Sequence, residues 1–257
     1  MIFKAQPVTQ PRQPRPSHLG AFKFLSVGRT HEGCVRELNE DAMLNRPDIG
    51  LWAVADGMGG HDGGEVASAT VIDALDNVDN FCTAYAFRDA AAQALHWANA
   101  KIFALSVERG TMGATVVTLL AHGNHYACLW AGDSRIYLYR TGALKRLTRD
   151  HSVVQEMVDA GAISEERARA HPRANVITRA VGARDQLDLE SAVGSLQAGD
   201  RFLLCSDGLT GVVTEREICE AMIRAPLEAA AERLLEQALA RGAPDNVTLV
   251  LVAAEPA

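Results

Sequence analysis

The sequence predicts an α+β fold in which two mostly antiparallel β-sheets pack face to face and helices flank them on both sides, an α-β-β-α sandwich. The order of elements predicts the class: helical stretches separate early strands, hairpin-like strands follow, and helices return near the end. This order differs from the strict strand–helix alternation of a parallel sheet. The hydrophobic fraction, 48% of 257 residues, is sufficient to fill the core of such a domain.

Short runs rich in Val, Leu, Tyr and Phe, each bounded by Gly, Asp or Asn, are predicted as strands. They cover residues 22–28, 51–56, 115–121, 126–132, 135–140, 201–207 and 246–252. Longer stretches with helical composition are predicted as helices over residues 65–78, 88–109, 215–223 and 226–240. The last helix has Pro226 at a suitable first position and Gly242 just beyond its end.

Two segments stand apart from this pattern. Residues 1–20 hold four prolines between Pro7 and Pro16 and three basic residues without an acidic one, so we predict a flexible Pro-rich tail. The rest, residues 21–257, is predicted as a single domain. Within it, residues 150–181 form a polar helical insert broken at Gly161 and Pro172. Both a substrate-facing flap and an ordinary surface helix pair fit this insert.

Composition excludes several classes. A net charge of -7 argues against a general nucleic-acid binder, which usually shows a basic excess. Five cysteines, an odd number without a CxxC pair, indicate reduced thiols in the cytosol. No apolar stretch reaches the ~18–20 residues of a membrane span, and no signal core precedes a cleavage site. We therefore expect a cytoplasmic protein with no membrane or nucleic-acid partner.

Aspartates at the ends of apolar runs are the main functional signal. Asp56 and Asp207 each precede a glycine after such a run, and Asp245 lies in the turn before the last predicted strand. An isolated Asp-Gly pair usually marks only a turn. Three carboxylates gathered at one end of a sheet would instead form a hard oxygen site suited to Mg²⁺ or Mn²⁺.

Further motifs accompany these aspartates in a fixed order. They are RELNED at 36–41, ADGMGGH at 55–61, MGAT at 112–115, AGDSR at 131–135, LTRDH at 147–151, HPRAN at 171–175, SDGL at 206–209 and DNVT at 245–248. The ordered set resembles the metal-dependent protein serine/threonine phosphatases of type 2C in their bacterial form, from about Gly28 to Val252. The resemblance implies the same sandwich, with a binuclear Mn²⁺ or Mg²⁺ centre at one end.

The resemblance also implies roles for particular residues. Asp56 would bridge two core ions with the Gly57 carbonyl as a further ligand, and Asp207 and Asp245 would bind the second ion. Asp133, with Asp207, would hold a weaker third ion. The remaining roles fall to residues that do not bind a core ion: Asp41 would orient a metal-bound water with help from Glu40, and Arg36 would bind the phosphate.

These roles agree with general chemistry. Two divalent cations lower the pKa of a shared water, so a hydroxide is available near neutral pH to attack phosphorus in line. Arginine suits the phosphate because its planar fork gives paired hydrogen bonds and keeps its charge. No other cofactor is expected, and removal of the ions with EDTA should abolish activity.

Two positions depart from the family pattern. Animal members often carry a histidine as the proposed general acid at the place where this chain has Met58, and Ala114 stands in a segment that otherwise resembles Gly-Thr-Thr. His61 lies three residues after Met58, and His151 and His171 border the insert; each is more typical of a turn or surface residue than of the acid. We assign none of them to protonating the leaving group, which a metal-bound water could do instead.

Other functions were weighed. Cys82 and Arg88 have the C-x₅-R spacing of cysteine phosphatases, but no glycine lies between them to shape a phosphate loop. Two alternatives stay open, a phospho-binding module without turnover and a phosphatase of small metabolites. The favoured hypothesis is a monomeric protein phosphatase that acts on phosphoserine and phosphothreonine in protein substrates and opposes a cognate serine/threonine kinase in signal transduction.

Overall fold

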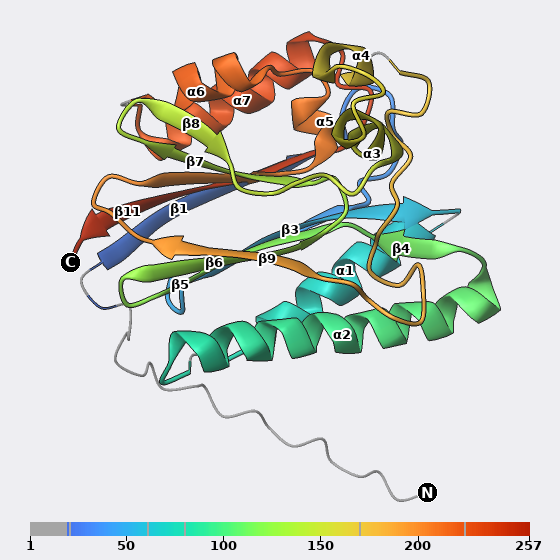
Figure 1. Ribbon diagram of the computed structural model, residues 1–257, viewed down its shortest axis with the longest axis horizontal. Helices are drawn as coiled ribbons and strands as arrows, with labels where there is room; N and C mark the ends of the chain where they lie inside the picture. Colours follow the sequence, from blue (N-terminus) through green and yellow to red (C-terminus); the bar gives the residue numbers. More distant parts are fainter. Residues whose placement is uncertain (1–19, 21, 61, 80, 170, 224) are drawn as a thin grey trace, which may run out of the picture.

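A computed structural model describes residues 20, 22–60, 62–79, 81–169, 171–223 and 225–257. The predicted tail therefore lies outside the described residues except for Gly20. The remaining chain forms four layers, helices on a sheet and helices on a second sheet, with the two sheets face to face (Figure 1). The predicted fold class is confirmed.

The first sheet has five strands in the order β1-β11-β10-β7-β8. All of its neighbouring strands are antiparallel. The strands are β1 (Phe22–His31), β7 (Arg135–Arg140), β8 (Ala143–Arg146), β10 (Arg201–Cys205) and β11 (Val247–Pro256). The first and last strands of the chain thus pair along their whole length, Phe22 with Pro256 and His31 with Val247.

The second sheet has the order β2-β3-β5-β6-β9, and the short strand β4 pairs with the end of β3. Its neighbouring strands are antiparallel as well. The strands are β2 (Asp41–Arg46), β3 (Leu51–Gly59), β4 (Met112–Ala114), β5 (Val116–His122), β6 (His125–Ala131) and β9 (Glu190–Ser195). This sheet brings Asp41 and Asp56 to the same end of the sandwich.

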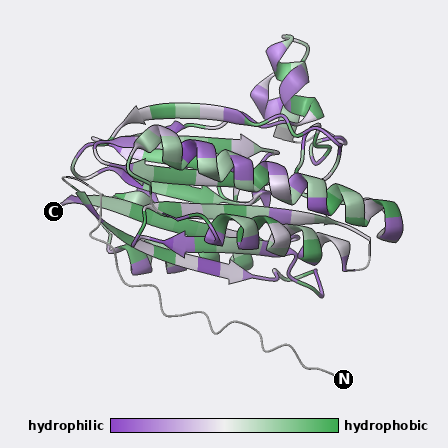
Figure 2. Ribbon diagram, turned by 90° about the horizontal axis from the view of Figure 1, so that it is seen from below, coloured by the Kyte–Doolittle hydropathy of each residue, from purple (hydrophilic) through white to green (hydrophobic). Residues whose placement is uncertain are grey.

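The core between the sheets is built from large apolar side chains. Trp52 and Phe202 are fully buried there, and Phe24 packs edge-on against Trp52 with ring centroids 5.2 Å apart. Hydrophobic residues concentrate in the strands, whereas the helices carry both polar and apolar residues (Figure 2). Burial of the strands on both faces explains why they read as apolar runs rather than as alternating patterns.

Two groups of helices cover the outer faces. The helices α1 (Gly63–Asp76) and α2 (Ala84–Arg109) pack on the second sheet. The helices α5 (Asp207–Thr210), α6 (Glu215–Met222) and α7 (Leu227–Ala240) pack on the first. Thr83 caps α2 by accepting the Ala86 N–H, and Thr214 with Glu217 forms a capping box on α6.

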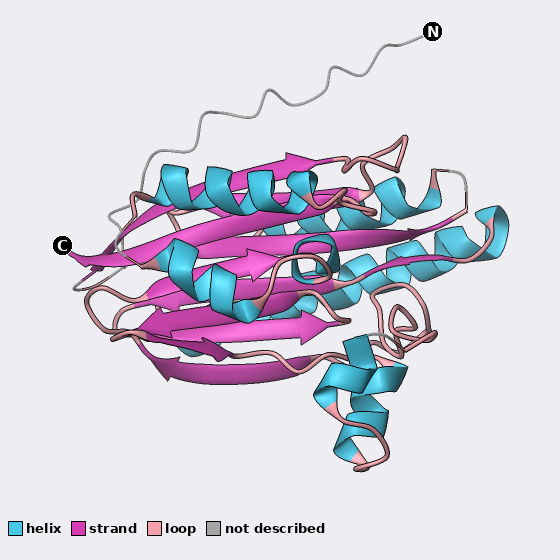
Figure 3. Cartoon of the chain, turned by 90° about the horizontal axis from the view of Figure 1, so that it is seen from above, coloured by secondary structure: helices cyan, strands magenta, loops and turns pink. Residues whose placement is uncertain are grey.

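The insert between β8 and β9 holds two short helices, α3 (Val153–Asp159) and α4 (Glu165–Arg169). They project from one end of the layered body (Figure 3). An isolated bridge between Ser152 and Ile177 closes the neck of this insert. Within the described residues, no helix is both long and apolar enough to cross a bilayer.

Several boundaries differ from the sequence-based expectations. The helix α2 starts at Ala84 rather than at residue 88, and the strand β10 ends at Cys205, so Asp207 lies in the first turn of α5 instead of at a strand end. The strands β2, β8 and β9 were not predicted. Each is short and polar, and none of them stands out from a loop by composition.

Candidate metal centre

The elements that carry the predicted site residues converge at the end of the sandwich where α5 and the α3–α4 insert lie (Figure 1). They come from five separate segments of the chain. Asp41 begins β2, Asp56 and Gly57 lie near the end of β3, Asp133 lies in the β6–β7 turn, Asp207 begins α5, and Asp245 precedes β11. Both sheets therefore contribute carboxylates to one region.

Asp41 and Asp56 face each other across β2 and β3 in the antiparallel register. Side chains directly opposite in this way share a face of the sheet, so two like charges are brought together. Asp41 Oδ2 accepts a 2.8 Å hydrogen bond from the Ser206 hydroxyl. Its other oxygen, Oδ1, is buried and has no hydrogen-bond partner among the described residues. That oxygen is free to accept one more hydrogen bond.

A hydroxyl network ties Asp56 to the turn that carries Asp133. Thr115 donates its backbone N–H to the Asp56 carbonyl at 2.8 Å, and its Oγ1 accepts the Asp56 N–H at 3.2 Å. The same Oγ1 is 2.7 Å from Ser134 Oγ. Gly57 follows, and a methyl group there would overlap the backbone of Gly64, so only glycine fits. Through Thr115, these hydrogen bonds fix the end of β3 relative to the β6–β7 turn.

Burial, and to a smaller extent their mutual repulsion, raises the pKa values of the clustered carboxyl groups. Burial raises the pKa of Asp41 to about 7 and that of Asp133 to about 8, and the charge of Asp207 adds to both shifts. Burial also raises the pKa of Asp207, to which Asp245 adds, and lifts that of Asp56 well above its usual range. Such carboxylates lose their protons readily only if a cation replaces them.

Arg36 lies at the exposed rim of this cluster. Its Nε and Nη2 donate to the two carboxylate oxygens of Asp245, both at 2.9 Å. This paired hydrogen bond raises the pKa of Arg36, and 53% of the arginine side chain stays exposed. Asn246 fixes the segment that carries Arg36, because its side chain bonds the backbone of Glu32, Leu38 and Glu40.

Glu40 sits beside Asp41 at the base of the site. Its carbonyl accepts the Gly57 N–H at 3.1 Å, and its carboxylate approaches Gly64 at the start of α1. Burial raises the pKa of Glu40, whereas the Gly64 N–H and Arg36 lower it. Glu40 thus joins β3 to α1, a structural role that the sequence alone did not indicate.

The supporting residues Ser206, Thr115, Ser134 and Asn246 were not predicted to have roles. Ser206, Ser134 and Asn246 each stand next to a predicted carboxylate, whereas Thr115 ends the motif MGAT, which contains none. A small polar residue next to a buried aspartate was the available signal, since buried carboxylate oxygens and turn backbones need hydrogen-bond partners. Which partner each would meet depends on long-range contacts.

The candidate histidines do not provide a general acid. His151 is buried, contrary to the expectation of a turn or surface residue, and its Nδ1 accepts the Gly132 N–H at 3.1 Å. His171 Nδ1 accepts the Arg173 N–H in an exposed turn. His61 lies outside the described residues. No role in protonating a leaving group follows for His151 or His171.

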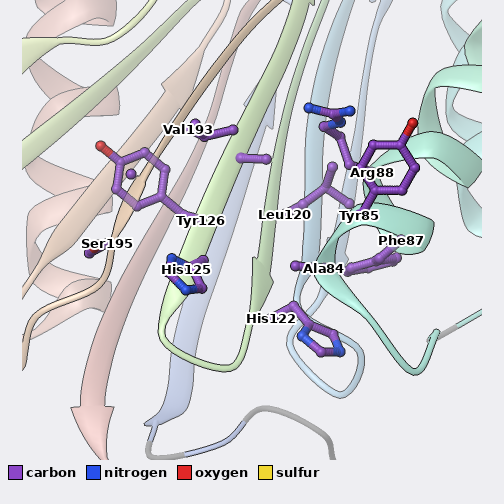
Figure 4. Close-up of a pocket in the computed structure, with 12 residues that line it drawn as sticks. Ala84, Tyr85, Phe87, Arg88, Leu120, His122, His125, Tyr126, Val193 and Ser195 are labelled. Carbon is purple, nitrogen blue, oxygen red and sulfur yellow. The ribbon is translucent and has the colours of Figure 1, made fainter.

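A pocket of about 220 Å³ opens next to the carboxylates, between them and the α3–α4 insert. Asp133 and Asp207 line one side of it, and Val154, Val158 and Glu165 of the insert line the other. A second pocket, of about 330 Å³, lies at the opposite end of β5, around His122 and Tyr126 (Figure 4). None of the predicted site residues lines that second pocket.

The donor set fits hard divalent cations. Oxygen ligands dominate, and the unsatisfied Asp41 Oδ1 together with the raised carboxyl pKa values indicates a place for positive charge. Within the described ranges, no three His, Cys, Asp or Glu side chains already form a group that would hold an ion by themselves. Mg²⁺ and Mn²⁺ need few protein carboxylates, because they keep several waters.

The fold and this donor set place the chain in the class of metal-dependent α+β sandwich proteins. Residues 25–157 match the family described as Protein phosphatase 2C. The serine/threonine protein phosphatase PstP of Mycobacterium tuberculosis is 40% identical over 228 residues, which cover 88% of this chain and 44% of that relative. The chain thus spans less than half the length of the mycobacterial relatives it matches.

Two solved structures are similar over almost their whole length. PppA of Pseudomonas aeruginosa, described as a key regulatory component of T6SS, has a TM-score of 0.84 and 42% identity, covering 90% of this chain and 97% of that one. The catalytic domain of PstP in complex with two manganese ions has a TM-score of 0.81 and 38% identity, covering 91% and 99%. The chain belongs to the protein phosphatase 2C family.

Proposed function

We propose that this chain is a protein phosphatase that hydrolyses phosphoserine and phosphothreonine monoesters in protein substrates with the help of a binuclear Mn²⁺ or Mg²⁺ centre. The observation that carries the proposal is the gathering of five buried or half-buried aspartates beside an exposed arginine in a member of this family. The manganese-bound relative supports the identity of the ions.

Asp56, Asp207 and Asp245, with the Gly57 carbonyl, would hold the two core ions, and Asp133 with Asp207 would hold a weaker third. When bound, the ions lower the pKa of a shared water, so that hydroxide is available near neutral pH. The chain supplies the rest of the arrangement. Ser206 fixes one carboxylate oxygen of Asp41, and the other, Oδ1, is free. Oδ1 can accept a hydrogen bond from the attacking water and so orient it.

Arg36 would bind the phosphoryl oxygens at the rim. Its guanidinium is charged at all working pH values and is exposed to solvent. A phosphate monoester can therefore compete with Asp245 for the guanidinium N–H donors. Glu40 supports the base of the site through Gly57 and Gly64. Since His151 Nδ1 accepts the Gly132 N–H and His171 Nδ1 accepts the Arg173 N–H, we assign neither ring as the acid, and water would protonate the leaving alkoxide.

We further propose a cytoplasmic, monomeric enzyme that reverses a serine/threonine kinase in signal transduction, with the α3–α4 insert as a flap beside the substrate. The named serine/threonine phosphatases among the relatives support the substrate class. The pocket between the flap and the carboxylates supports a contact with the substrate chain. Light scattering on the purified protein checks the monomer.

Replacement of a predicted ligand tests the proposal. Asp207→Ala should lower turnover of a phosphothreonine peptide by more than about 100-fold, beyond the effect typical of a group that only orients a ligand. The exposed Asp73→Ala on α1 is the matched control and should keep full activity. Both proteins should unfold cooperatively. Wild-type rates for Asp207→Ala at saturating Mn²⁺ would contradict the assignment of Asp207 as a metal ligand. Faster turnover of sugar phosphates than of peptides by the wild-type protein would favour a metabolite phosphatase.

A further inference from the structure

His151 joins the flap to the turn that carries Asp133. We propose that His151 is a positioning residue, which holds this turn by accepting the Gly132 N–H at its imidazole Nδ1. The inference rests on the proposed function, because it gives His151 a part in placing one of the metal-site carboxylates. No contact between His151 and the reacting atoms is required.

Two hydrogen bonds connect His151 to Gly132. The His151 backbone N–H donates to the Gly132 carbonyl at 2.9 Å, and the Gly132 N–H donates to His151 Nδ1 at 3.1 Å. Gly132 has a φ of +112°, and a methyl group there would overlap the Thr115 side chain. The turn therefore needs glycine at this point, and a flexible glycine needs an external partner to stay in one conformation.

The imidazole ring itself is held in place. It is buried and stacks on Trp130, with ring centroids 6.3 Å apart and planes at 14°. The Trp130 indole N–H donates to the Arg149 carbonyl at 2.9 Å, and this bond fixes the indole on which the imidazole stacks. Because Nδ1 accepts a backbone N–H, the neutral ring must carry its hydrogen on Nε2, which lies 3.1 Å from Glu190 Oε1.

The other residues of the turn are tied to different elements. Ser134 bonds Thr115 at 2.7 Å, and Arg135 forms a paired hydrogen bond with Asp150. Asp133 is thus flanked by fixed residues on both sides. His151 holds the Gly132 side of the turn, and its carbonyl accepts the N–H of Thr178, on the returning segment of the flap neck, at 2.7 Å. The neck of the flap and the Asp133 turn are therefore connected through one residue.

Two substitutions separate the hydrogen bond from packing. In His151→Asn, the Oδ1 atom takes nearly the place of Nδ1 and can accept the Gly132 N–H. In His151→Gln, a side chain of similar size has its polar atoms one bond further out. We expect the Gly132 amide to exchange with solvent about tenfold faster in the Gln variant and near the wild-type rate in the Asn variant.

The second readout is metal binding, measured by calorimetry with Mn²⁺. His151→Gln should weaken binding of the third Mn²⁺ ion, the one held by Asp133, by about tenfold and leave the affinity for the two core ions unchanged. His151→Asn should bind the third ion with nearly the wild-type affinity. When Asp133→Asn is already present, His151→Gln should weaken Mn²⁺ binding little further, since both changes act on the same turn. His171→Gln is the matched control, because His171 also accepts a backbone N–H but lies in an exposed turn of the flap.

The proposal fails if Gln and Asn behave alike, or if the Gly132 amide exchanges at the wild-type rate without the imidazole. It also fails if nitrogen chemical shifts of the wild-type ring place the hydrogen on Nδ1, a measurement that needs no variant to fold. An inactive wild-type protein would refute the phosphatase function. The exchange rate of Gly132 and the ring tautomer would still decide the role of His151.

Discussion

Arg36 and Asp245 form a paired hydrogen bond at the edge of the site, although the family resemblance assigns one to phosphate and the other to a metal ion. The two assignments are compatible because a guanidinium has five N–H donors and a carboxylate has several lone pairs. The pair neutralises one charge of the acidic cluster and keeps the arginine within reach of its phosphate partner. Both partners are partly exposed, so their mutual stabilisation of the fold is small.

Arg36→Ala should raise KM for a phosphopeptide by about 10-fold to 100-fold while kcat changes little, because a charged hydrogen bond to phosphate is made in the ground state and the transition state alike. Steady-state kinetics at saturating Mn²⁺ measures both constants. Arg216→Ala, which removes an exposed arginine paired with Glu220 on the same helix, should leave both unchanged. An unchanged KM in Arg36→Ala would count against a phosphate-binding role.

The carboxylates show what could be predicted from single residues. Asp56 and Asp245 lie at junctions between apolar runs and turns, which the sequence displays directly. The opposition of Asp41 to Asp56 was not predictable, because it depends on the unpredicted strand β2. The resemblance supplied the roles of Arg36 and Asp133. Neither residue type nor spacing would have distinguished Arg36 from the many surface arginines.

Most of the strands that the sequence predicted are buried on both faces, and the edge strand β1 is an exception. The strands β3, β5, β10 and β11 read as apolar runs because a sheet covers one side and helices cover the other. The edge strands β2, β8 and β9 lack this signal. In β9 the polar and apolar residues mix and Val193 is exposed, so its pairing with β6 follows from tertiary contacts rather than from composition.

The flap is an insert with a narrow neck, and this geometry allows it to be removed. The Val153 N–H donates to the Val176 carbonyl at 2.9 Å, and Ser152 pairs with Ile177. The two chain ends at the neck are therefore adjacent. A short Gly-rich turn can replace residues 154–175 without stretching the remaining chain, while Asp150 and His151 keep their places outside the deletion.

If the flap contacts the substrate protein, this deletion should raise KM for a phosphopeptide by about tenfold and change turnover of p-nitrophenyl phosphate by only a few-fold, since a small substrate does not reach the flap. The two substrates are compared on the same preparation, with thermal unfolding as the check on folding. Equal losses on both would mean that the flap is needed for the site itself.

The site depends on the whole sandwich, because both sheets and a helix contribute aspartates to it. Bringing them together costs stability in the absence of cations, as the raised pKa values of Asp41 and Asp133 indicate. A carboxyl group whose pKa is raised by folding contributes its stability fully below the unfolded pKa. That contribution is lost as the pH rises through the folded value.

The melting temperature of metal-free protein should therefore fall as the pH rises from 5 to 8, the range in which Asp41 and Asp133, with pKa values of about 7 and 8, lose their protons. Each kcal/mol corresponds to about 2–4 °C in a domain of this size. Mn²⁺ should reverse the decline, with an effect that grows with pH as ions displace protons. Thermal unfolding in EDTA tests this.

Asp133→Asn should flatten that decline, because it removes a carboxyl group whose ionisation is opposed by burial and, to a smaller extent, by the charge of Asp207. A melting temperature that rises with pH in EDTA, or an unchanged slope in the variant, would show that folding does not raise the pKa values of these carboxyl groups. Melting temperatures measured over the same pH range with Mn²⁺ show directly how far the ions displace protons from the carboxyl groups.

The most direct test of the central claim is phosphate release from a phosphothreonine peptide, measured with Mn²⁺, then with excess EDTA, and then after the metal is restored. We predict turnover that stops on chelation and returns with Mn²⁺, because the aspartates at the end of the sandwich can assist hydrolysis only through bound cations. A folded protein that releases no phosphate with Mn²⁺, or that releases it equally well in EDTA, would contradict the assignment of a metal-dependent protein phosphatase.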